Sequence, residues 1–243
     1  VGSEMCIRDR LVRLLKKFDA IYVESDMMKS ALQRRGFENA VVMYNFKEHE
    51  PLAESDIEYP KSEPYKLCTF SRVMKEKGIE DAINAVESVN AHFGRTVYTL
   101  DIFGQVDVEY KERFSQLEKS FPDYISYGGA IEANKSVETL KSYFALLFPT
   151  YYKGEGFAGT LIDAMSAGVP VIASDWKYNP EFVVPGKTGV IIENCNAERL
   201  AEELINIAAA PEKWNSMRLS ALKESEKYKP DIAARPLIDR ING

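Results

Sequence analysis

Two acidic side chains, Glu155 and Asp163, stand eight residues apart in the stretch GEGFAGTLIDAMSAGVPVIASD, which runs from Gly154 to Asp175. The glycines on either side of Glu155 would let the backbone approach a ligand closely. Because Asp163 lies about two helical turns further on, both carboxylates could face one cleft roughly 10 Å long. A retaining glycosidase needs its two carboxylates about 5 Å apart, whereas this wider spacing suits two acids that each bind a different diol of one extended ligand. On spacing alone, a loop glutamate and an exposed helical acid remain the simpler explanation.

Positive side chains lie upstream, in the stretch FSRVMKEKG. Arg72 and Lys77 follow an expected strand and precede an expected helix, whose first N–H groups favour an anion. Two cations there could hold a diphosphate and stabilise the charge that builds on it as a bond breaks. The alternative is that Lys75 and Lys77 are solvated loop lysines, and position alone does not decide between the two.

The elements that would position these residues alternate between strand and helix. Apolar runs predict strands over residues 18–25, 40–45, 66–70, 96–104, 124–129, 145–150, 169–175 and 189–192. Helical patterns occupy residues 26–36, 79–93, 108–121, 135–144, 159–168 and 197–210. This alternation is typical of an α/β fold with a doubly wound parallel sheet, because parallel strands need helical crossovers. Ligands of such sheets bind beyond the carboxyl ends of the strands, where both charged stretches are expected.

Composition excludes several classes of function. The formal net charge is −6, without a long basic run, so nucleic acid is a poor default partner. An apolar fraction of 45% without eighteen consecutive apolar residues makes a transmembrane span improbable. Cys6, Cys68 and Cys195 are far apart and form no CxxC, which indicates reduced thiols rather than a disulfide framework or zinc site. His49 and His92 make no metal-spaced pair, so we expect neither a histidine-rich metal centre nor a histidine triad.

The first ten residues, VGSEMCIRDR, have no initiator methionine, no apolar core of a signal peptide and no amphipathic pattern. They resemble the translated read-through of a sequencing adaptor. We therefore expect residues 1–10 to be non-native, and the chain to be a gene fragment whose upstream part is missing.

The run GEGFAGTLIDAMSAGVPVIASDWKYNPE, with SRVMKEKG upstream, resembles the retaining glycosyltransferases of the GT-B fold, family 4 type (glycosyl transferases group 1). Their signature is a glutamate, seven residues and a second glutamate, followed by A-x-A-x-G-x-P-V-I-A-S-D and a further glutamate. The resemblance implies a Rossmann-like nucleotide-sugar-binding domain over residues 65–228. It further implies a remnant of the N-terminal acceptor domain over 11–45, a linker over 46–64 and a helix over 229–243 that returns to that domain.

The resemblance also implies roles for matched residues. Arg72 and Lys77 would bind the donor diphosphate, and Glu155 would contact the hexose hydroxyls, so these three would carry catalysis. The remaining ligand-binding positions would be Gly128 in a turn near the base, Gly156 and Phe157 at the sugar, Thr160 and Leu161 through their backbones near the phosphates and ribose, Asp163 at the ribose diol, and Glu181 at the later glutamate.

Some residues depart from the family pattern. Asp163 replaces a glutamate and shortens the reach by one bond of about 1.5 Å, so its ribose contact could be direct or through water. Ser71 replaces the usual glycine, and Ala158 a frequent proline. The loop DWKYNPE replaces a double-glycine turn. Trp176 and Tyr178 could therefore remodel the sugar pocket, or Trp176 could pack on the sheet edge.

The function that the resemblance implies is transfer of a sugar from a UDP- or GDP-sugar to an acceptor hydroxyl with retention at the anomeric carbon. A front-face displacement would need no metal and no other cofactor. The acceptor would be a glycan or a lipid-linked molecule in polysaccharide or glycoconjugate biosynthesis. We expect a cytoplasmic protein, with any membrane contact peripheral and made by the missing domain.

Three alternatives stay open. The chain could bind a nucleotide sugar without turnover, because the acceptor half is expected to be missing, and we expect the fragment itself to be inactive. A sugar-nucleotide epimerase of the GT-B type would share the architecture. A Rossmann-type oxidoreductase is disfavoured, since no GxGxxG follows a strand with an acid some twenty residues later.

Overall fold

The computed structural model describes residues 10–48, 50–193 and 195–243, which form two separate parallel sheets. In the small sheet, β1 (Ile21–Val23) pairs with β2 (Ala40–Val42), and α2 (Asp26–Gln33) connects them. The main sheet has the order β5-β4-β3-β6-β7-β8. Its strands are β3 (Tyr65–Phe70), β4 (Tyr98–Phe103), β5 (Ile125–Gly129), β6 (Ala145–Phe148), β7 (Val171–Ser174) and β8 (Gly189–Ile192). All neighbouring strands run parallel, which confirms the predicted doubly wound sheet.

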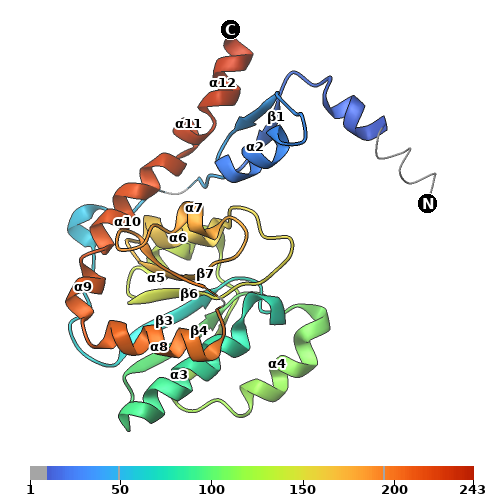
Figure 1. Cartoon of the computed structure of the whole chain (residues 1–243). Coiled ribbons are helices and arrows are strands. Elements are labelled where there is room, and N and C mark those ends of the chain that lie inside the picture. The colour runs from blue at the N-terminus through green and yellow to red at the C-terminus, as the bar shows by residue number, and fades with distance from the viewer. Residues whose placement is uncertain (1–9, 49, 194) are drawn as a thin grey trace.

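Helices cover both faces of the main sheet (Figure 1). One face carries α3 (Ile79–Phe93), α4 (Lys111–Glu118), α8 (Ala197–Ala208) and α9 (Pro211–Asn215). The other carries α5 (Ser136–Leu140), α6 (Gly159–Ser166), α7 (Asn179–Phe182) and α10 (Arg218–Ser225). Five 3₁₀ turns also occur in the described residues: η1 (Glu54–Asp56), η2 (Lys75–Lys77), η3 (Val108–Tyr110), η4 (Ala133–Lys135) and η5 (Glu226–Tyr228). The chain ends in α11 (Pro230–Ala233) and α12 (Arg235–Asn242), where one terminal helix was predicted.

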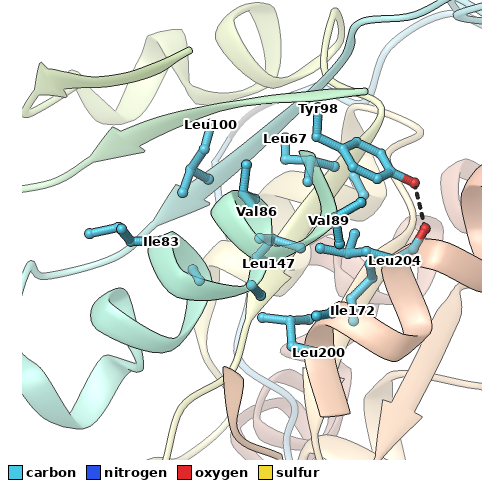
Figure 2. Close-up of a cluster of buried hydrophobic side chains, with 14 of the residues drawn as sticks. Leu67, Ile83, Val86, Val89, Tyr98, Leu100, Leu147, Ile172, Leu200 and Leu204 are labelled. Atoms are coloured by element: carbon cyan, nitrogen blue, oxygen red, sulfur yellow. Dashed lines mark hydrogen bonds between the residues drawn. The ribbon is translucent and has the colours of Figure 1, made fainter. Parts of the chain in front are cut away.

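The core lies on both faces because successive strand residues point in opposite directions. Leu67 and Cys68 in β3 are both fully buried, yet they belong to different apolar clusters. Figure 2 shows the first cluster, in which side chains of α3 and α8 meet those of the strands. The Tyr98 hydroxyl donates a 2.8 Å hydrogen bond to the Leu204 carbonyl, so β4 is tied to α8 through a polar contact inside this cluster.

Two glycines set the ends of α3. Gly78 and Gly94 both adopt the left-handed conformation, with φ of 71° and 62°, which favours glycine. The helix therefore spans the residues that its pattern predicted. The helix expected over residues 108–121 is shorter in the structure, where α4 ends at Glu118. Pro122 disfavours a helical conformation for the residue before it.

The elements predicted from the sequence do not include α9 and α10. Trp214 of α9 donates its indole N–H to the Phe144 carbonyl at 2.9 Å. Arg218 of α10 is completely buried and donates to the carbonyls of Tyr143 and Lys141, both at 2.9 Å. Burial lowers the pKa of Arg218 to about 10. These contacts anchor the C-terminal helices on the segment that leads from α5 into β6.

Several described residues between positions 10 and 64 contact the main domain. The Leu52 N–H donates to the Ser166 carbonyl at 2.8 Å, and the Asn215 amide donates to the Pro60 carbonyl at 2.7 Å. Figure 1 shows the small sheet beside the helices that end the chain, and Arg240 of α12 donates to the Asp19 carbonyl at 2.8 Å. The domain boundaries named above stay predictions. Residues 1–9 of the segment predicted to be non-native lie outside the described residues.

Candidate functional site

A hollow of about 270 Å³ lies where the order of the main sheet changes direction, between β3 and β6. In an open α/β sheet this switch point is the expected ligand crevice, because the loops after the two strands lead to opposite sides. The hollow is lined by Phe70, Ser71, Arg72, Met74, Lys77, Phe148, Tyr152, Glu155, Ala158, Gly159 and Thr160. Four of the predicted site residues therefore meet at one place: Arg72, Lys77, Glu155 and Thr160.

A second hollow, of about 250 Å³, adjoins the first and shares Phe70, Ser71 and Thr160 with it. Its other lining residues are Lys47, Phe103, Gly104, Gln105, Ala130, Ile131 and Asp163. Four of the five charged residues predicted from the sequence thus border two adjoining hollows, which share Thr160. An extended ligand could occupy both.

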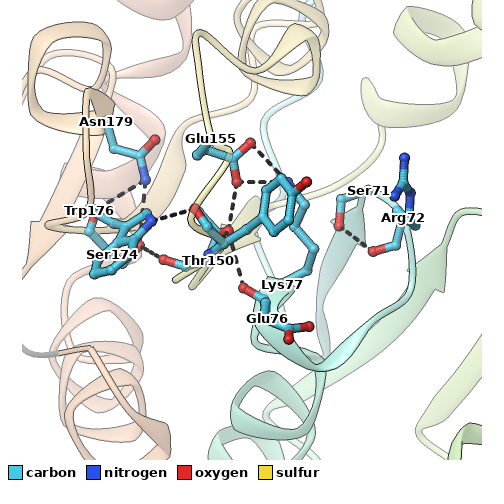
Figure 3. A network of polar contacts seen from close by, with 10 residues as sticks. Ser71, Arg72, Glu76, Lys77, Thr150, Glu155, Ser174, Trp176 and Asn179 are labelled. Atoms are coloured by element: carbon cyan, nitrogen blue, oxygen red, sulfur yellow. Dashed lines mark hydrogen bonds and ion pairs between the residues drawn. The ribbon is translucent and has the colours of Figure 1, made fainter. Parts of the chain in front are cut away.

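Glu155 and Lys77 form a buried ion pair in the first hollow (Figure 3). The Lys77 ammonium lies 2.9 and 2.7 Å from the two oxygens of the Glu155 carboxylate. The Lys77 side chain is only 12% exposed, and the Glu155 side chain only 6%. The ammonium also lies 5.5 Å from the ring centre of Phe148 and 5.2 Å from that of Tyr152, within the range of a cation–π contact. The Thr150 hydroxyl donates to the same carboxylate at 2.7 Å, so Glu155 has a fixed orientation.

Gly78 brings Lys77 close to Glu155. A Cβ added at Gly78 would lie 2.3 Å from the Pro149 carbonyl oxygen, so the turn after β3 packs directly on the end of β6. The Tyr151 N–H donates to the Glu76 carbonyl at 2.8 Å and joins the same two turns. Only glycine allows this approach.

A further set of hydrogen bonds supports the loop that carries Glu155. The Ser174 hydroxyl donates to the Thr150 carbonyl at 2.5 Å, and the Asn179 amide donates to the Ser174 carbonyl at 3.2 Å. Trp176 donates its indole N–H to the Tyr152 carbonyl at 2.7 Å. Trp176 therefore supports the loop through this hydrogen bond. It is not among the described residues that line the two hollows.

Arg72 is the most accessible cation of the first hollow. Its side chain is 60% exposed, and its nearest carboxylate oxygen, from Asp107, is 3.7 Å away. An exposed pair of this kind contributes about 0–1 kcal/mol. The guanidinium can therefore exchange this contact for an anion at small cost.

Asp163 lies in the second turn of α6 and is only 1% exposed. Its carboxylate accepts hydrogen bonds from the Lys47 ammonium at 2.5 Å and from the Ser136 hydroxyl at 2.9 Å. Lys47 follows β2, in a segment for which the sequence predicted only a linker. No local pattern distinguishes it from a solvated lysine, so sequence reasoning missed it.

Phe157 and Leu161 lie beneath the first hollow rather than in its wall. Phe157 is 2% exposed and stacks on Phe182, with the ring centres 3.6 Å apart. Tyr44 and Tyr228 pack edge-on against it. Leu161 is fully buried, and its N–H already donates to a carbonyl within the turn before α6. The ligand contacts predicted for these two residues stay predictions.

The predicted glycine positions also serve close packing. A Cβ at Gly128 would lie 2.2 Å from the ring of Phe103, which itself lines the second hollow. Gly128 lies in β5 rather than in the predicted turn, and Ala130 and Ile131, which follow that strand, line the hollow too. A Cβ at Gly156 would lie 2.6 Å from a carboxylate oxygen of Glu24. Neither glycine is among the described lining residues.

Glu181 contacts the N-terminal segment. Its carboxylate accepts hydrogen bonds from the N–H groups of Asp26 and Met27, at 2.7 and 3.0 Å, and so caps the N-terminus of α2. Beside it, the Tyr44 hydroxyl donates to Asp26 at 3.2 Å. Burial, together with the charge of Asp26, raises the pKa of Tyr44 to about 12. Glu181 is absent from the described lining of both hollows, and its predicted role toward a ligand stays untested.

Within the described residues, no cluster of three His, Cys, Asp or Glu side chains could hold a metal ion. No described helix has both the length and the apolar character needed to cross a membrane.

The amino-acid sequence of this chain is similar to a known protein family and to curated proteins. The family model for glycosyl transferases group 1 matches residues 52–224, more than half of the chain. The GtfA subunit of the UDP-N-acetylglucosamine–peptide N-acetylglucosaminyltransferase from Streptococcus gordonii is 30% identical over 178 residues, which cover 70% of this chain and 34% of that protein. The chain thus spans about a third of this curated relative.

Two solved structures show the same fold at low identity. HepE from Anabaena, in complex with UDP and glucose, superposes with a TM-score of 0.78 at 16% identity, over 96% of this chain and 66% of that one. TarM from S. aureus, in complex with UDP and other ligands, gives a TM-score of 0.76 at 19% identity, over 97% of this chain and 46% of that one.

Proposed function

The chain belongs to the family of glycosyl transferases group 1 and has the GT-B type of α/β fold, and we propose that it binds the sugar donor of a retaining glycosyltransferase. The observation that carries this proposal is the convergence of Arg72, Lys77, Glu155 and Asp163 on two joined hollows at the switch point of the sheet. A nucleoside diphosphate sugar is an extended ligand with a charged centre and a diol at each end.

In this proposal, the diphosphate lies in the first hollow. Arg72 is accessible there, and Lys77 lines the same wall. As the bond from the anomeric carbon to the diphosphate oxygen breaks, both electrons stay with that oxygen. The two cations would stabilise the added charge more strongly in the transition state than in the bound donor, which is the condition for catalysis.

Glu155 would accept hydrogen bonds from the sugar hydroxyls. Its carboxylate is held by Lys77 and Thr150, so little orientation has to be fixed when a sugar binds. A hydrogen bond to a charged group contributes about 1.5–3 kcal/mol. Asp163, which lines the second hollow, would bind the ribose diol directly or through water.

For the whole protein, we propose that the sugar passes to an acceptor hydroxyl on the face that the diphosphate leaves. The new bond joins the acceptor oxygen to the anomeric carbon, and the acceptor proton moves to the departing phosphate. The donor would be a UDP- or GDP-sugar. UDP is the first choice for a test, because the HepE and TarM structures are complexes with UDP. The acceptor would be a glycan or a lipid-linked molecule.

Thermal unfolding with added nucleotide tests donor binding by this chain. A ligand at 100 times its Kd stabilises the folded state by about 2.7 kcal/mol, which corresponds to roughly 5–11 °C in Tm for a protein of this size. We expect UDP or GDP to give such a shift, and NAD to give none. No shift with any nucleoside diphosphate at millimolar concentration would contradict the proposal.

A further inference from the structure

We infer that Lys47, which lies outside the main domain, supplies a third cation to the nucleotide site and binds a phosphate of the donor. This inference rests on the proposed function. Lys47 comes from the segment after β2, and its side chain lines the second hollow together with Asp163 and Thr160. The nucleotide site is therefore built from two parts of the chain.

The burial of the Lys47–Asp163 pair determines which charge a ligand meets. Asp163 is 1% exposed, whereas the Lys47 side chain is 28% exposed and lies 2.5 Å from it. Both residues line the second hollow, and the more exposed Lys47 side chain is the more accessible of the two to a ligand. One N–H of Lys47 is used by Asp163, and an ammonium has two more donors to offer. The buried carboxylate therefore holds the cation in place.

The stem of Lys47 crosses the N-terminus of α6. A Cβ added at Gly159, the first residue of that helix, would lie 2.9 Å from the Lys47 Cε. Helix N-termini carry a partial positive charge that disfavours a cation and favours an anion. A cation at this position is therefore best accommodated when an anion lies beside it, and the bond to Asp163 uses only one of the three N–H donors of the ammonium.

Thr160 gives an independent sign that a ligand belongs here. Its hydroxyl oxygen is buried and has no hydrogen-bond partner among the described residues, and Thr160 lines both hollows. Buried polar groups are rarely left unpaired. A phosphate oxygen between Lys47 and the start of α6 would be close enough to satisfy this hydroxyl as well.

The competing explanation is that Lys47 only neutralises the buried Asp163. The two explanations differ in how the effect depends on phosphate. A structural counterion would affect nucleoside and nucleoside diphosphate equally, because both carry the ribose that Asp163 is proposed to bind. A phosphate-binding cation would affect the diphosphate alone.

The test compares the affinities of UDP and uridine, measured by titration calorimetry and by competition, for wild type and Lys47→Met. If the wild type prefers GDP, GDP and guanosine are used. We expect Lys47→Met to weaken UDP binding by about tenfold or more, as for loss of one charge-assisted hydrogen bond, and uridine binding by less than about threefold. Lys61→Met is the matched control, because it removes the same charge from an exposed position in the segment that connects β2 to β3. It should leave both affinities unchanged.

A second variant guards against loss of folding. Lys47→Met leaves Asp163 buried without its lysine, whereas Lys47→Met/Asp163→Asn replaces the ion pair by neutral groups of similar size. The double variant should bind UDP more weakly than the single variant Asp163→Asn does. The difference in affinity between these two variants should be smaller for uridine.

Equal losses of UDP and uridine affinity, or wild-type affinity for UDP in Lys47→Met, would overturn the inference while leaving the proposed function intact. A wild-type protein that binds neither UDP nor GDP would overturn the proposed function and the inference with it.

Discussion

The Lys77–Glu155 ion pair predicts an asymmetric response to mutation. Replacing Lys77 by methionine leaves the Glu155 carboxylate, whose side chain is 6% exposed, with the Thr150 hydroxyl as its hydrogen-bond donor. Loss of one partner from a buried pair costs about 3–5 kcal/mol. Because Thr150 still donates to the carboxylate, we expect the lower end, about 3 kcal/mol in the free energy of unfolding. This corresponds to a fall in Tm of roughly 6–12 °C.

Replacing Glu155 by glutamine should cost less. The Lys77 side chain is more exposed than that of Glu155, and its ammonium keeps the rings of Phe148 and Tyr152 at 5.5 and 5.2 Å. A cation–π contact contributes about 0.5–2 kcal/mol, so we expect Glu155→Gln to lower the free energy of unfolding by only about 1–2 kcal/mol. The double variant Lys77→Met/Glu155→Gln contains no unpaired charge, and it should be more stable than Lys77→Met alone.

Chemical denaturation of the four proteins in this cycle measures the coupling energy, which we expect to be about 2–3 kcal/mol. Lys75→Met is the control, since this neighbouring lysine is exposed and its loss should change the free energy of unfolding by less than about 0.5 kcal/mol. Two single variants with equal effects that simply add in the double variant would refute the assignment of a buried, coupled pair.

Three other variants test the support around the site and the packing of the domain. Thr150→Val should weaken binding of a UDP-sugar by about three- to tenfold relative to UDP, because it removes the donor that orients Glu155; Thr150→Ser should restore it, and equal losses for UDP would contradict this role. Arg218→Ala should lower the free energy of unfolding by about 3 kcal/mol in urea titrations, since two buried carbonyls lose their donor; an effect below about 1 kcal/mol would contradict it. Full burial raises the pKa of the Cys68 thiol well above its usual value, so at pH 8 a thiol reagent should label Cys68 only as fast as the protein unfolds, and rapid labelling in a Cys6→Ser/Cys195→Ser background would contradict that.

The sheet could be predicted from the sequence because its signals are local. Apolar runs mark each strand, and Gly78 and Gly94 define the ends of α3. The helices α9 and α10 were missed because their anchoring is not local. Trp214 and Arg218 are positioned by hydrogen bonds to carbonyls of residues about seventy positions earlier in the chain. No periodic pattern in the sequence predicts those bonds.

The candidate site could be predicted in part. The types and order of Arg72, Lys77, Glu155 and Asp163 placed them at the carboxyl edge of the sheet, where the structure has them. Their partners could not be predicted. The bond between Lys77 and Glu155 joins residues 78 positions apart, and that between Lys47 and Asp163 joins residues 116 apart. Such contacts depend on how distant loops pack.

Phe157 shows a further limit of local reasoning. Its place beside Glu155 and Gly156 indicated a residue of the sugar pocket. In the structure, its ring stacks on Phe182 and meets Tyr44 and Tyr228, which come from three separate parts of the chain. An aromatic residue beside a functional motif can belong either to the pocket or to the core beneath it, and the motif alone does not distinguish the two.

Calorimetric titration of Arg72→Ala with the preferred nucleoside diphosphate tests the central claim most directly. Arg95→Ala is the matched control, because Arg95 is also an exposed arginine in an ion pair, with Glu63, but precedes β4 at the opposite edge of the sheet. If the switch-point hollow binds the diphosphate, Arg72→Ala should weaken binding by about tenfold or more, the effect of one lost charge-assisted contact, while Arg95→Ala binds like the wild type. Wild-type affinity in Arg72→Ala, or equal losses in both variants, would contradict the account.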